Sequence, residues 1–267
     1  SFGGEDELSE IYADLQVMVH KIKEKDAKMY EARLSEQQLL NEQQVMEMKM
    51  LASQINPHFL YNTLESIRMQ ALTAGNREVA NSIKLLGKSM RYVLENTGTA
   101  MVTLKKELDY METYLQIQRI RFGSRFNYEI HMQEGFDPNH YMILPILLQP
   151  IVENAFKHGI SPKEEGGVVR IRVNPLREKG LLYISVCDNG VGIERARLEQ
   201  LKNALAKPGE RWEHIGVYNV AARLRLLDER SHLEICSHPG RGTAIRLYLP
   251  LIEPEEEDLD DDPIVDC

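Results

Sequence analysis

The sequence predicts an α+β protein of more than one domain, with a long coiled-coil dimerisation region ahead of a two-layer α/β sandwich. Two observations lead to this fold class. Residues 5–74 carry apolar side chains at alternating spacings of three and four, and residues 125–251 alternate short apolar runs with helical periodicity and glycine-rich turns. The length of 267 residues suits two domains, or one domain and a stalk. We expect four segments: a signalling helix over 1–50, dimerisation helices over 51–122, an α/β domain over 123–251, and an acidic, disordered tail over 252–267.

The stalk comes first, and its apolar residues form a sustained heptad. The seam is interrupted by the polar residues Lys25, Glu36 and Gln43. About 60 helical residues would span about 90 Å, and a single helix of that length cannot bury its own stripe. We therefore expect a homodimer. Its apolar seam residues in the first 50 positions are Ile11, Leu15, Met18, Ile22, Met29, Ala32, Leu39, Met46 and Met50. Residues 5–11 resemble the start of the second helix of a HAMP relay module, and an ordinary charged helix start explains them equally well.

Within the stalk, the stretch Q-I-N-P-H-F-L-Y-N at 54–62 places His58 directly after a proline. His58 lies one position past the apolar seam, so it should face outward, beside Asn62 and Glu65. Pro57 lacks an N–H and crowds the preceding turn, which predicts a bend in the helix just before His58. An exposed imidazole at a bend is a candidate nucleophile for a phosphoryl group. A helix break without chemistry is the alternative.

Two further helices follow the stalk. A turn at 73–76 separates the first helix from a second one over 77–96, which should fold back as an antiparallel hairpin. Two hairpins from two chains would form a four-helix bundle. A third helix over 104–121, with Thr103 as its N-cap, is interpreted as the connector to the next domain.

The α/β domain is predicted from alternating strand and helix patterns. The expected strands cover 126–132, 168–173, 181–187, 233–236 and 243–249. The expected helices cover 145–158, the stretch from 194 to about 206, and 215–227.

Charge and cysteine content exclude several classes of protein. The nine acidic residues in 253–266, with no basic residue among them, equal the whole formal charge of −9. The remainder is near neutral, and no basic stripe indicates a nucleic-acid binder. Cys187, Cys236 and Cys267 have no paired spacing, which favours a reducing compartment over a disulfide or cysteine–metal framework. We expect Cys187 and Cys236 to be small buried hydrophobic residues. The most apolar run, 141–152, is too short to cross a bilayer and contains two prolines.

Three polar clusters in the α/β domain could bind a nucleotide. In 153–158 the amide of Asn154 is a hard ligand for Mg²⁺, and Lys157 and His158 could meet phosphate oxygens. In 188–193 a strand ends at Asp188, which could accept a hydrogen bond from an adenine amino group, and Gly190 and Gly192 allow close approach. In 214–219, a glycine before a helix could expose N–H groups to phosphate. Each cluster alone is equally typical of a polar helix end or a turn.

Taken together and in this order, these motifs resemble the sensor histidine kinases of the YesM/LytS type. The match consists of N-P-H-F-L-Y-N at 56–62, the three clusters, and Gly240-Arg241-Gly242-Thr243, over residues 5–250. The resemblance implies an ATP domain of the GHKL, or Bergerat, fold, with ATP and Mg²⁺ as cofactors. It also implies a homodimer that passes phosphate to an aspartate of a response-regulator receiver domain. The chain would be the cytoplasmic portion of a membrane protein, anchored only through upstream segments.

The same resemblance implies a role for individual residues. His58 would be the phosphoacceptor. Asn154 would hold Mg²⁺, Lys157 and His158 would contact phosphates, and Asp188 would read adenine. The remaining cofactor-binding residues would be Gly190, Gly192 and Gly216, which let a lid close over ATP, together with Asn219, and Thr243 near the base.

Two departures from the family pattern leave alternatives open. Phe59 stands where better-known histidine kinases have a carboxylate that can act as a base, so Glu153, Glu65 or water could accept the His58 proton. His214 stands where the family has a glycine, which could weaken lid closure. A GHKL ATPase without autophosphorylation, with Glu153 as the base for water, is one competing hypothesis. A non-catalytic coiled-coil scaffold with a degenerate nucleotide domain is another.

Overall fold

The computed structural model describes residues 57–163, 166–206 and 215–254. Contacts divide the chain into two compact units, Ser1–Ile55 and Asn56–Cys267, and all described residues belong to the second. The predicted coiled coil, the HAMP-like segment, the bend before His58, His214 and the acidic stretch from residue 255 lie outside the described residues.

The first two described helices form the predicted antiparallel hairpin. They are α2 (Pro57–Thr73) and α3 (Arg77–Asn96). Asn76 caps α3, because its side chain accepts a hydrogen bond from the Val79 N–H at 3.1 Å. The helices face each other at Gly87, where an added Cβ would lie 3.8 Å from Leu64 Cδ1. The four-helix bundle requires a second chain and stays a prediction.

Helix α4 (Leu104–Phe122) begins at the predicted N-cap Thr103, which accepts a hydrogen bond from the Lys106 N–H. Its apolar stripe is fully or almost fully buried in the same core as the sheet, and comprises Leu104, Leu108, Met111 and Leu115. Helix α4 therefore follows the hairpin in the chain and also supplies side chains to the core of the α/β region. The core therefore begins ahead of residue 123, where we expected the domain boundary.

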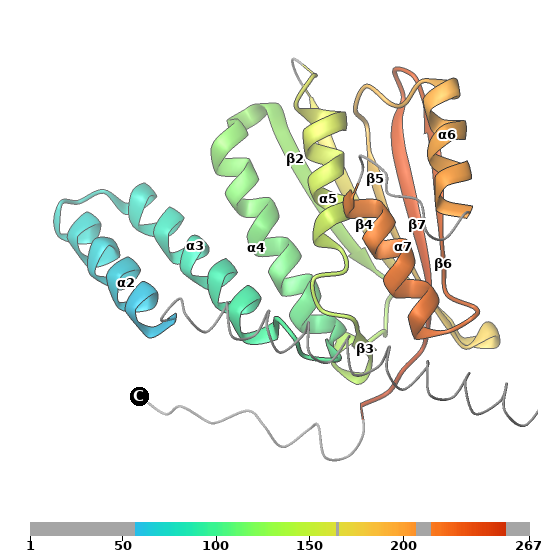
Figure 1. Ribbon diagram of the computed structural model, residues 1–267. Coiled ribbons are helices and arrows are strands. Elements are labelled where there is room, and N and C mark those ends of the chain that lie inside the picture. The colour runs from blue at the N-terminus through green and yellow to red at the C-terminus, as the bar shows by residue number, and fades with distance from the viewer. Residues whose placement is uncertain (1–56, 164–165, 207–214, 255–267) are drawn as a thin grey trace, which may run out of the picture. The chain divides into compact units, whose positions relative to one another are not determined.

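A five-stranded sheet forms one layer of this core (Figure 1). Its strand order is β2-β4-β5-β7-β6, and β2 pairs parallel to β4 while the other neighbours pair antiparallel. The bounds are β2 (Phe126–Met132), β4 (Gly167–Leu176), β5 (Leu181–Asp188), β6 (His232–His238) and β7 (Gly242–Pro250). All five predicted strands are confirmed.

A short second ladder was not predicted. Strand β1 (Val102–Thr103) pairs antiparallel with β3 (Met142–Ile143), and Met142 also bridges Ile252. Two-residue strands carry no detectable alternation, which is why the sequence did not reveal them. Ile252, which we assigned to the tail, is tied to the domain by this bridge.

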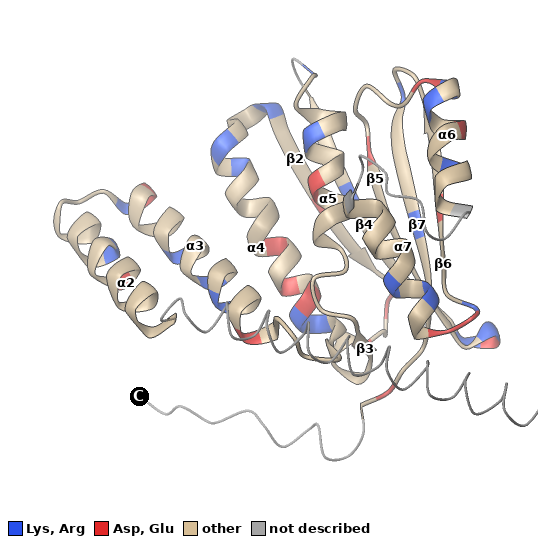
Figure 2. Cartoon of the chain, viewed as in Figure 1, with Lys and Arg blue, Asp and Glu red and all other residues tan. Residues whose placement is uncertain are grey.

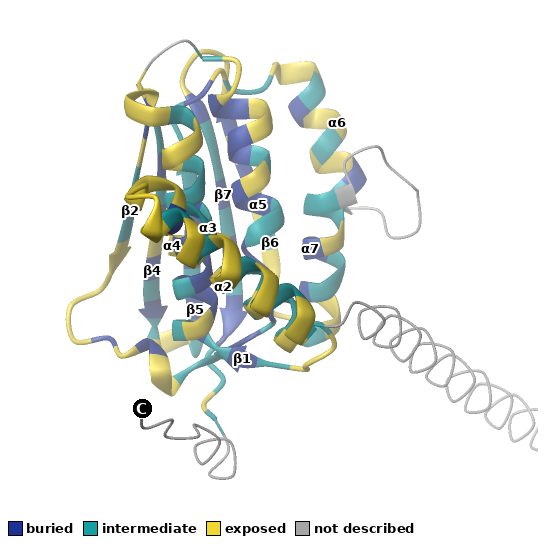
Figure 3. Ribbon diagram, turned by 90° about the vertical axis from the view of Figure 1, so that its left-hand side faces the viewer, coloured by how far each residue is buried: buried dark blue, intermediate teal, exposed yellow. Residues whose placement is uncertain are grey.

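Helices α4, α5, α6 and α7 cover one face of the sheet, which gives the predicted two layers (Figures 1 and 3). The bounds are α5 (Gln149–Asn154), α6 (Arg195–Ala206) and α7 (Ile215–Leu227), and α5 continues as the π-helical segment η3 (Ala155–Ile160). Short 3₁₀ turns η1 (Gly123–Arg125), η2 (Pro138–His140) and η4 (Arg177–Lys179) connect elements.

The start of α5 differs from our prediction. We expected a helix from Pro145, but Ile146 has a φ of +56°, which a right-handed helix cannot include. The helix begins at Gln149, and Pro150 lies in its first turn, where a missing N–H costs nothing. The π-helical continuation also went unpredicted, because apolar spacing does not distinguish it from an α-helix.

Surface properties of the described residues agree only in part with expectation. Cys236 is exposed, which corrects our prediction that it is buried: it alternates with buried Ile235 on the edge strand β6 and faces away from the helices. Cys187 is half-buried. Acidic and basic side chains are interspersed along α3 and α4 (Figure 2). None of the helices described is long and apolar enough to span a membrane.

Candidate functional site

A cavity of about 320 Å³ lies between the sheet and helices α5, α6 and α7. Most of its wall is apolar, contributed by Ile151, Val186, Ile193, Leu201, Val217, Ile235 and Ile245. Four predicted site residues also line it: Asn154, His158, Asp188 and Thr243. An apolar pocket with a few convergent polar groups is typical of a small-molecule site.

Asp188 sits at the end of β5, in the wall of the cavity. Its Oδ1 accepts hydrogen bonds from the backbone N–H groups of Gly190 (2.8 Å) and Thr243 (3.2 Å). Burial raises the pKa of Asp188, and these two backbone donors act in the opposite direction. Oδ2 makes no hydrogen bond to a described residue, so it keeps its acceptor capacity for a ligand.

Gly190 and Gly192 are required by close backbone approach within the protein itself. A Cβ at Gly190 would lie 2.3 Å from the carbonyl carbon of Gly159, and one at Gly192 would lie 2.0 Å from the His238 oxygen. Gly192 also has a φ of +72°. We expected these glycines to make room for a base. The structure gives them a packing reason, and neither lines the cavity.

Ser237 ties the loop after Asp188 to the β6–β7 turn. Its hydroxyl accepts from the Ile193 N–H (2.9 Å), donates to the Gly242 carbonyl (3.0 Å), and lies 2.9 Å from Thr243 Oγ1. Ser237 thereby holds the Thr243 hydroxyl, while the backbone N–H of Thr243 contacts Asp188. Sequence reasoning missed Ser237, because a serine in a strand gives no signal of what it contacts.

The α5–η3 helix contributes Asn154 and His158 to the cavity, whereas Lys157 and Glu153 are exposed and do not line it. The Glu153 carboxylate accepts a hydrogen bond from Gln149 Nε2 at 2.5 Å.

Helix α7 begins directly against α5. A Cβ at Gly216 would lie 3.3 Å from Pro150 Cβ and 3.5 Å from Asn154 Nδ2. Gly216 therefore permits this contact beside Asn154. Asn219, on the same helix, is exposed and outside the cavity wall.

Arg197 and Tyr218 also line the cavity and were not predicted as site residues. Arg197 lies on α6 and Tyr218 on α7. Tyr218 lies inside the third cluster, at 214–219, so the sequence indicated its stretch but not its side chain. Arg197 looked like an ordinary exposed helix residue.

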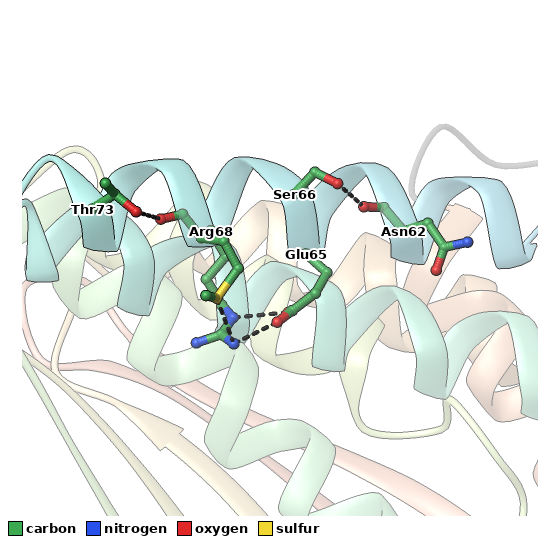
Figure 4. Close-up of polar contacts among 6 residues, drawn as sticks. Asn62, Glu65, Ser66, Arg68 and Thr73 are labelled. Carbon is green, nitrogen blue, oxygen red and sulfur yellow. Dashed lines mark hydrogen bonds and ion pairs between the residues drawn. The ribbon is translucent and has the colours of Figure 1, made fainter.

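His58 is exposed on α2, as predicted. The amide nitrogen of Asn62 lies 3.2 Å from His58 Nδ1 and 3.5 Å from Nε2, so the amide touches the ring edge. The other predicted neighbour, Glu65, is held by Arg68 through two hydrogen bonds of 2.8 and 2.5 Å (Figure 4). Arg68 lowers the pKa of Glu65, which makes this carboxylate a poorer proton acceptor than we expected.

The side chains that line the cavity fit a nucleotide with its bound Mg²⁺. The apolar wall suits a planar base, Asp188 offers an acceptor for an exocyclic amino group, and Asn154 and His158 provide polar contacts. No group of three or more His, Cys, Asp or Glu residues that could hold a metal occurs among the described residues. A Mg²⁺ ion held by a nucleotide's phosphates and waters needs only one or two protein oxygens, which the Asn154 amide can supply.

Two family models match the chain. Residues 46–126 match the model described as "Histidine kinase", and residues 142–253 match "Histidine kinase-, DNA gyrase B-, and HSP90-like ATPase". Together they span most of the chain.

Curated relatives agree with these models. Sensor protein LytS of Bacillus anthracis is 29% identical over 260 residues, covering 97% of this chain and 42% of the relative. Sensor protein kinase HptS of Staphylococcus aureus is 30% identical over 207 residues, covering 77% of this chain and 38% of the relative. The chain thus spans about two-fifths of the length of these relatives.

Among solved structures, the histidine kinase domain of the Erythrobacter litoralis blue-light activated kinase covers 78% of this chain and 94% of its own. Its TM-score is 0.43 at 16% identity. The family models and the curated relatives show that the chain belongs to the sensor histidine kinases.

Proposed function

We propose that this chain is the kinase portion of a two-component sensor, which transfers the γ-phosphoryl group of ATP to His58 and from there to an aspartate of a response regulator. The observation that carries the proposal is the cavity in which Asp188, Thr243, Asn154 and His158 meet, in the same compact unit as the exposed His58. Membership of the family supports both halves of the reaction.

The proposed nucleotide contacts follow from the cavity's chemistry. The adenine ring fills the apolar part, and its amino group donates to Asp188, beside the Thr243 hydroxyl. Asn154 holds Mg²⁺ on the phosphate side, where His158 and the exposed Lys157 contact phosphate oxygens. The proposal also includes closure of a lid over ATP, as in the family. The residues proposed to allow it are Gly190, Gly192, Gly216 and Asn219.

The transfer step needs a neutral imidazole. A ring nitrogen of neutral His58 carries the lone pair that attacks the γ-phosphorus. A nitrogen–phosphorus bond forms as the bond from γ-phosphorus to the bridging oxygen breaks, and ADP leaves. Because this transition state is loose, alignment and charge neutralisation supply most of the catalysis. Asn62 orients the His58 ring, and Glu153 or water accepts the proton.

The proposed homodimer is supported by the apolar surface of the hairpin. Six large apolar side chains on α2 and α3 are at least 39% exposed: Phe59, Ile67, Met69, Leu72, Val79 and Leu86. Val79 and Leu86 are seven residues apart and share a helix face. A second copy of the hairpin would cover this surface as a four-helix bundle. We also propose that the chain is cytoplasmic, with any membrane anchor in upstream segments.

The test is incubation with γ-labelled ATP and Mg²⁺, followed by acid and base treatment of the labelled protein. We expect acid-labile, base-stable label in the wild type and none in His58→Gln, with ATP affinity unchanged in that variant. His140→Gln is the matched control, since His140 is also exposed and pairs only with Asp137 in the described structure. Label that persists in His58→Gln would refute the assignment. Phosphate release without labelled protein would favour an ATPase, and no ATP binding would favour a scaffold.

A further inference from the structure

Glu107 is a buried carboxylate that the proposed reaction does not use. It lies in the first turn of α4 with none of its surface exposed. Its Oε2 accepts from the Tyr92 hydroxyl (2.5 Å) and from the Ile146 N–H (2.9 Å), and its Oε1 accepts from the Leu148 N–H (2.9 Å). One side chain therefore joins α3, α4 and the segment that leads into α5.

The segment 145–148 is strained, and side chains bind both its N–H groups and its carbonyl groups. Ile146 has a φ of +56°, which costs a β-branched residue about 1–3 kcal/mol and persists only where its surroundings enforce it. Glu107 binds the N–H groups of this segment. Arg223 of α7 donates to the carbonyls of Pro145 (2.8 Å) and Ile146 (3.5 Å).

This segment sets where α5 begins. The helix starts at Gln149, directly after Leu148, and it carries Glu153 and Asn154. The side chain of Asn154 lines the cavity. A shift of the segment would therefore move Asn154 relative to Asp188, which is fixed on the sheet.

The hairpin reaches α5 by a second route as well. The ring of Tyr92 stacks on that of Tyr110, with centroids 4.3 Å apart and planes 14° from parallel. The Tyr110 hydroxyl donates to Gln149 Oε1 (2.6 Å), and Gln149 Nε2 donates to Glu153. Tyr92 is thus the α3 residue through which both routes pass.

Loss of the hydrogen bond from Tyr92 to the buried carboxylate of Glu107 would be costly. Burial raises the pKa of Glu107, and its hydrogen bonds to Tyr92 and the backbone act against that rise. A buried carboxylate that loses a donor is left with an uncompensated desolvation cost, so removing one partner is more harmful than the mean strength of a hydrogen bond suggests.

We propose that Glu107 is a positioning residue that couples the hairpin carrying His58 to the nucleotide helix α5, with the Tyr92 hydroxyl as the contact that α3 makes or withdraws. The proposal rests on the proposed kinase function. When α3 holds Tyr92 on Glu107, the segment 145–148 keeps its strained form and Asn154 stays in register with Asp188. When Tyr92 is withdrawn, the segment relaxes and α5 loses its fixed start.

The experiment compares Tyr92→Phe with Tyr183→Phe, a tyrosine on β5 that has no part in this network. Tyr92→Phe keeps the ring stack and removes only the hydroxyl. We expect it to lower the rate of His58 labelling about tenfold while ATP affinity stays within about twofold, which is a change in kcat rather than KM. Tyr183→Phe should label at the wild-type rate.

A readout that needs no kinase activity separates this proposal from the proposed function. Amide exchange at Ile146 and Leu148, followed by NMR, should be faster in Tyr92→Phe than in wild type and unchanged in Tyr183→Phe. Adding Glu107→Gln to Tyr92→Phe should lower labelling no further than Glu107→Gln alone, because both changes act on one contact. Wild-type labelling and wild-type exchange in Tyr92→Phe would overturn the proposal. Absence of labelling in the wild type, with faster exchange in Tyr92→Phe, would overturn only the kinase function.

Discussion

The α2–α3 hairpin and the α/β region differ in how far they bury their apolar side chains. Helix α2 buries none of its residues and α3 buries only Ala80 and Leu85, whereas the α/β region closes around a continuous core that includes α4 (Figure 3). The α/β region can therefore satisfy its own hydrophobic demand within one chain. Among the described residues the hairpin does not, and its exposed apolar surface is the one that the proposed second copy would cover.

The two regions also differ in how they hold carboxylates. Asp188 and Glu107 are buried, and burial raises the pKa of each. Glu65 on the hairpin is exposed, and Arg68 lowers its pKa. Buried carboxylates are costly, and each of them sits where the site or its supports need a fixed acceptor.

The largest expected effect on ligand binding is that of Asp188→Asn, which tests the difference between the buried and the exposed carboxylates. The amide oxygen can still accept from Gly190 and Thr243, so its NH₂ would face the adenine amino group, donor against donor. We expect ATP affinity to fall about 30- to 100-fold, the equivalent of about 2–3 kcal/mol for a mismatched buried polar pair, measured by calorimetry. Glu65→Gln is the control and should bind ATP as the wild type does.

The same variant makes a pH prediction. Because the folded-state pKa of Asp188 is raised above its usual value of 3.8, the ionised carboxylate destabilises the folded protein at neutral pH. That cost disappears as the pH falls through the raised pKa toward 3.8. Asp188→Asn should therefore unfold at an equal or higher temperature than wild type at pH 7, and the difference should shrink on acidification. A difference that grows on acidification would contradict the assignment of burial as the cause.

The next prediction compares apolar side chains of the two regions, with Leu115→Ala in the core and Ile67→Ala on the hairpin surface. Leu115 is fully buried, so the substitution should lower the free energy of unfolding by about 2–5 kcal/mol, measured by denaturant titration. Ile67 is 44% exposed, and its substitution should barely change the unfolding of the α/β region. It should instead reduce the dimer fraction in sedimentation equilibrium. An unchanged dimer fraction would count against the hairpin as the dimer interface.

The smallest effect concerns the helix caps, one in each region. Thr103 caps α4 and Asn76 caps α3, and replacing either by alanine should cost about 1 kcal/mol of local helix stability. Thr103→Ala should lower the main thermal transition, because α4 belongs to the core. Asn76→Ala should alter only the helical signal of the hairpin. Equal shifts of the main transition would show that both regions unfold as one unit.

The site could be predicted in outline because its residues lie in short motifs with their own chemistry. Asn154, His158, Asp188 and Thr243 come from separate stretches, and all four line one cavity. Lys157, Gly190, Gly192 and Asn219 were drawn from the same motifs and lie outside its wall, so their roles stay predictions. Local patterning identifies which stretch belongs to a site, but not which side chain of that stretch points inward.

The sequence by itself determined the order of the main helices and of the five strands of the large sheet, the hairpin, the outward position of His58 and the apolar stripe of α4, because each depends on side-chain periodicity along one element. Only the tertiary structure decided that α4 belongs to the core, that Ile146 adopts a strained conformation, and that Glu107 is buried beneath Tyr92. A glutamate in the first turn of a helix looks like any solvated residue until three donors from distant parts of the chain surround it, and no local pattern records that meeting.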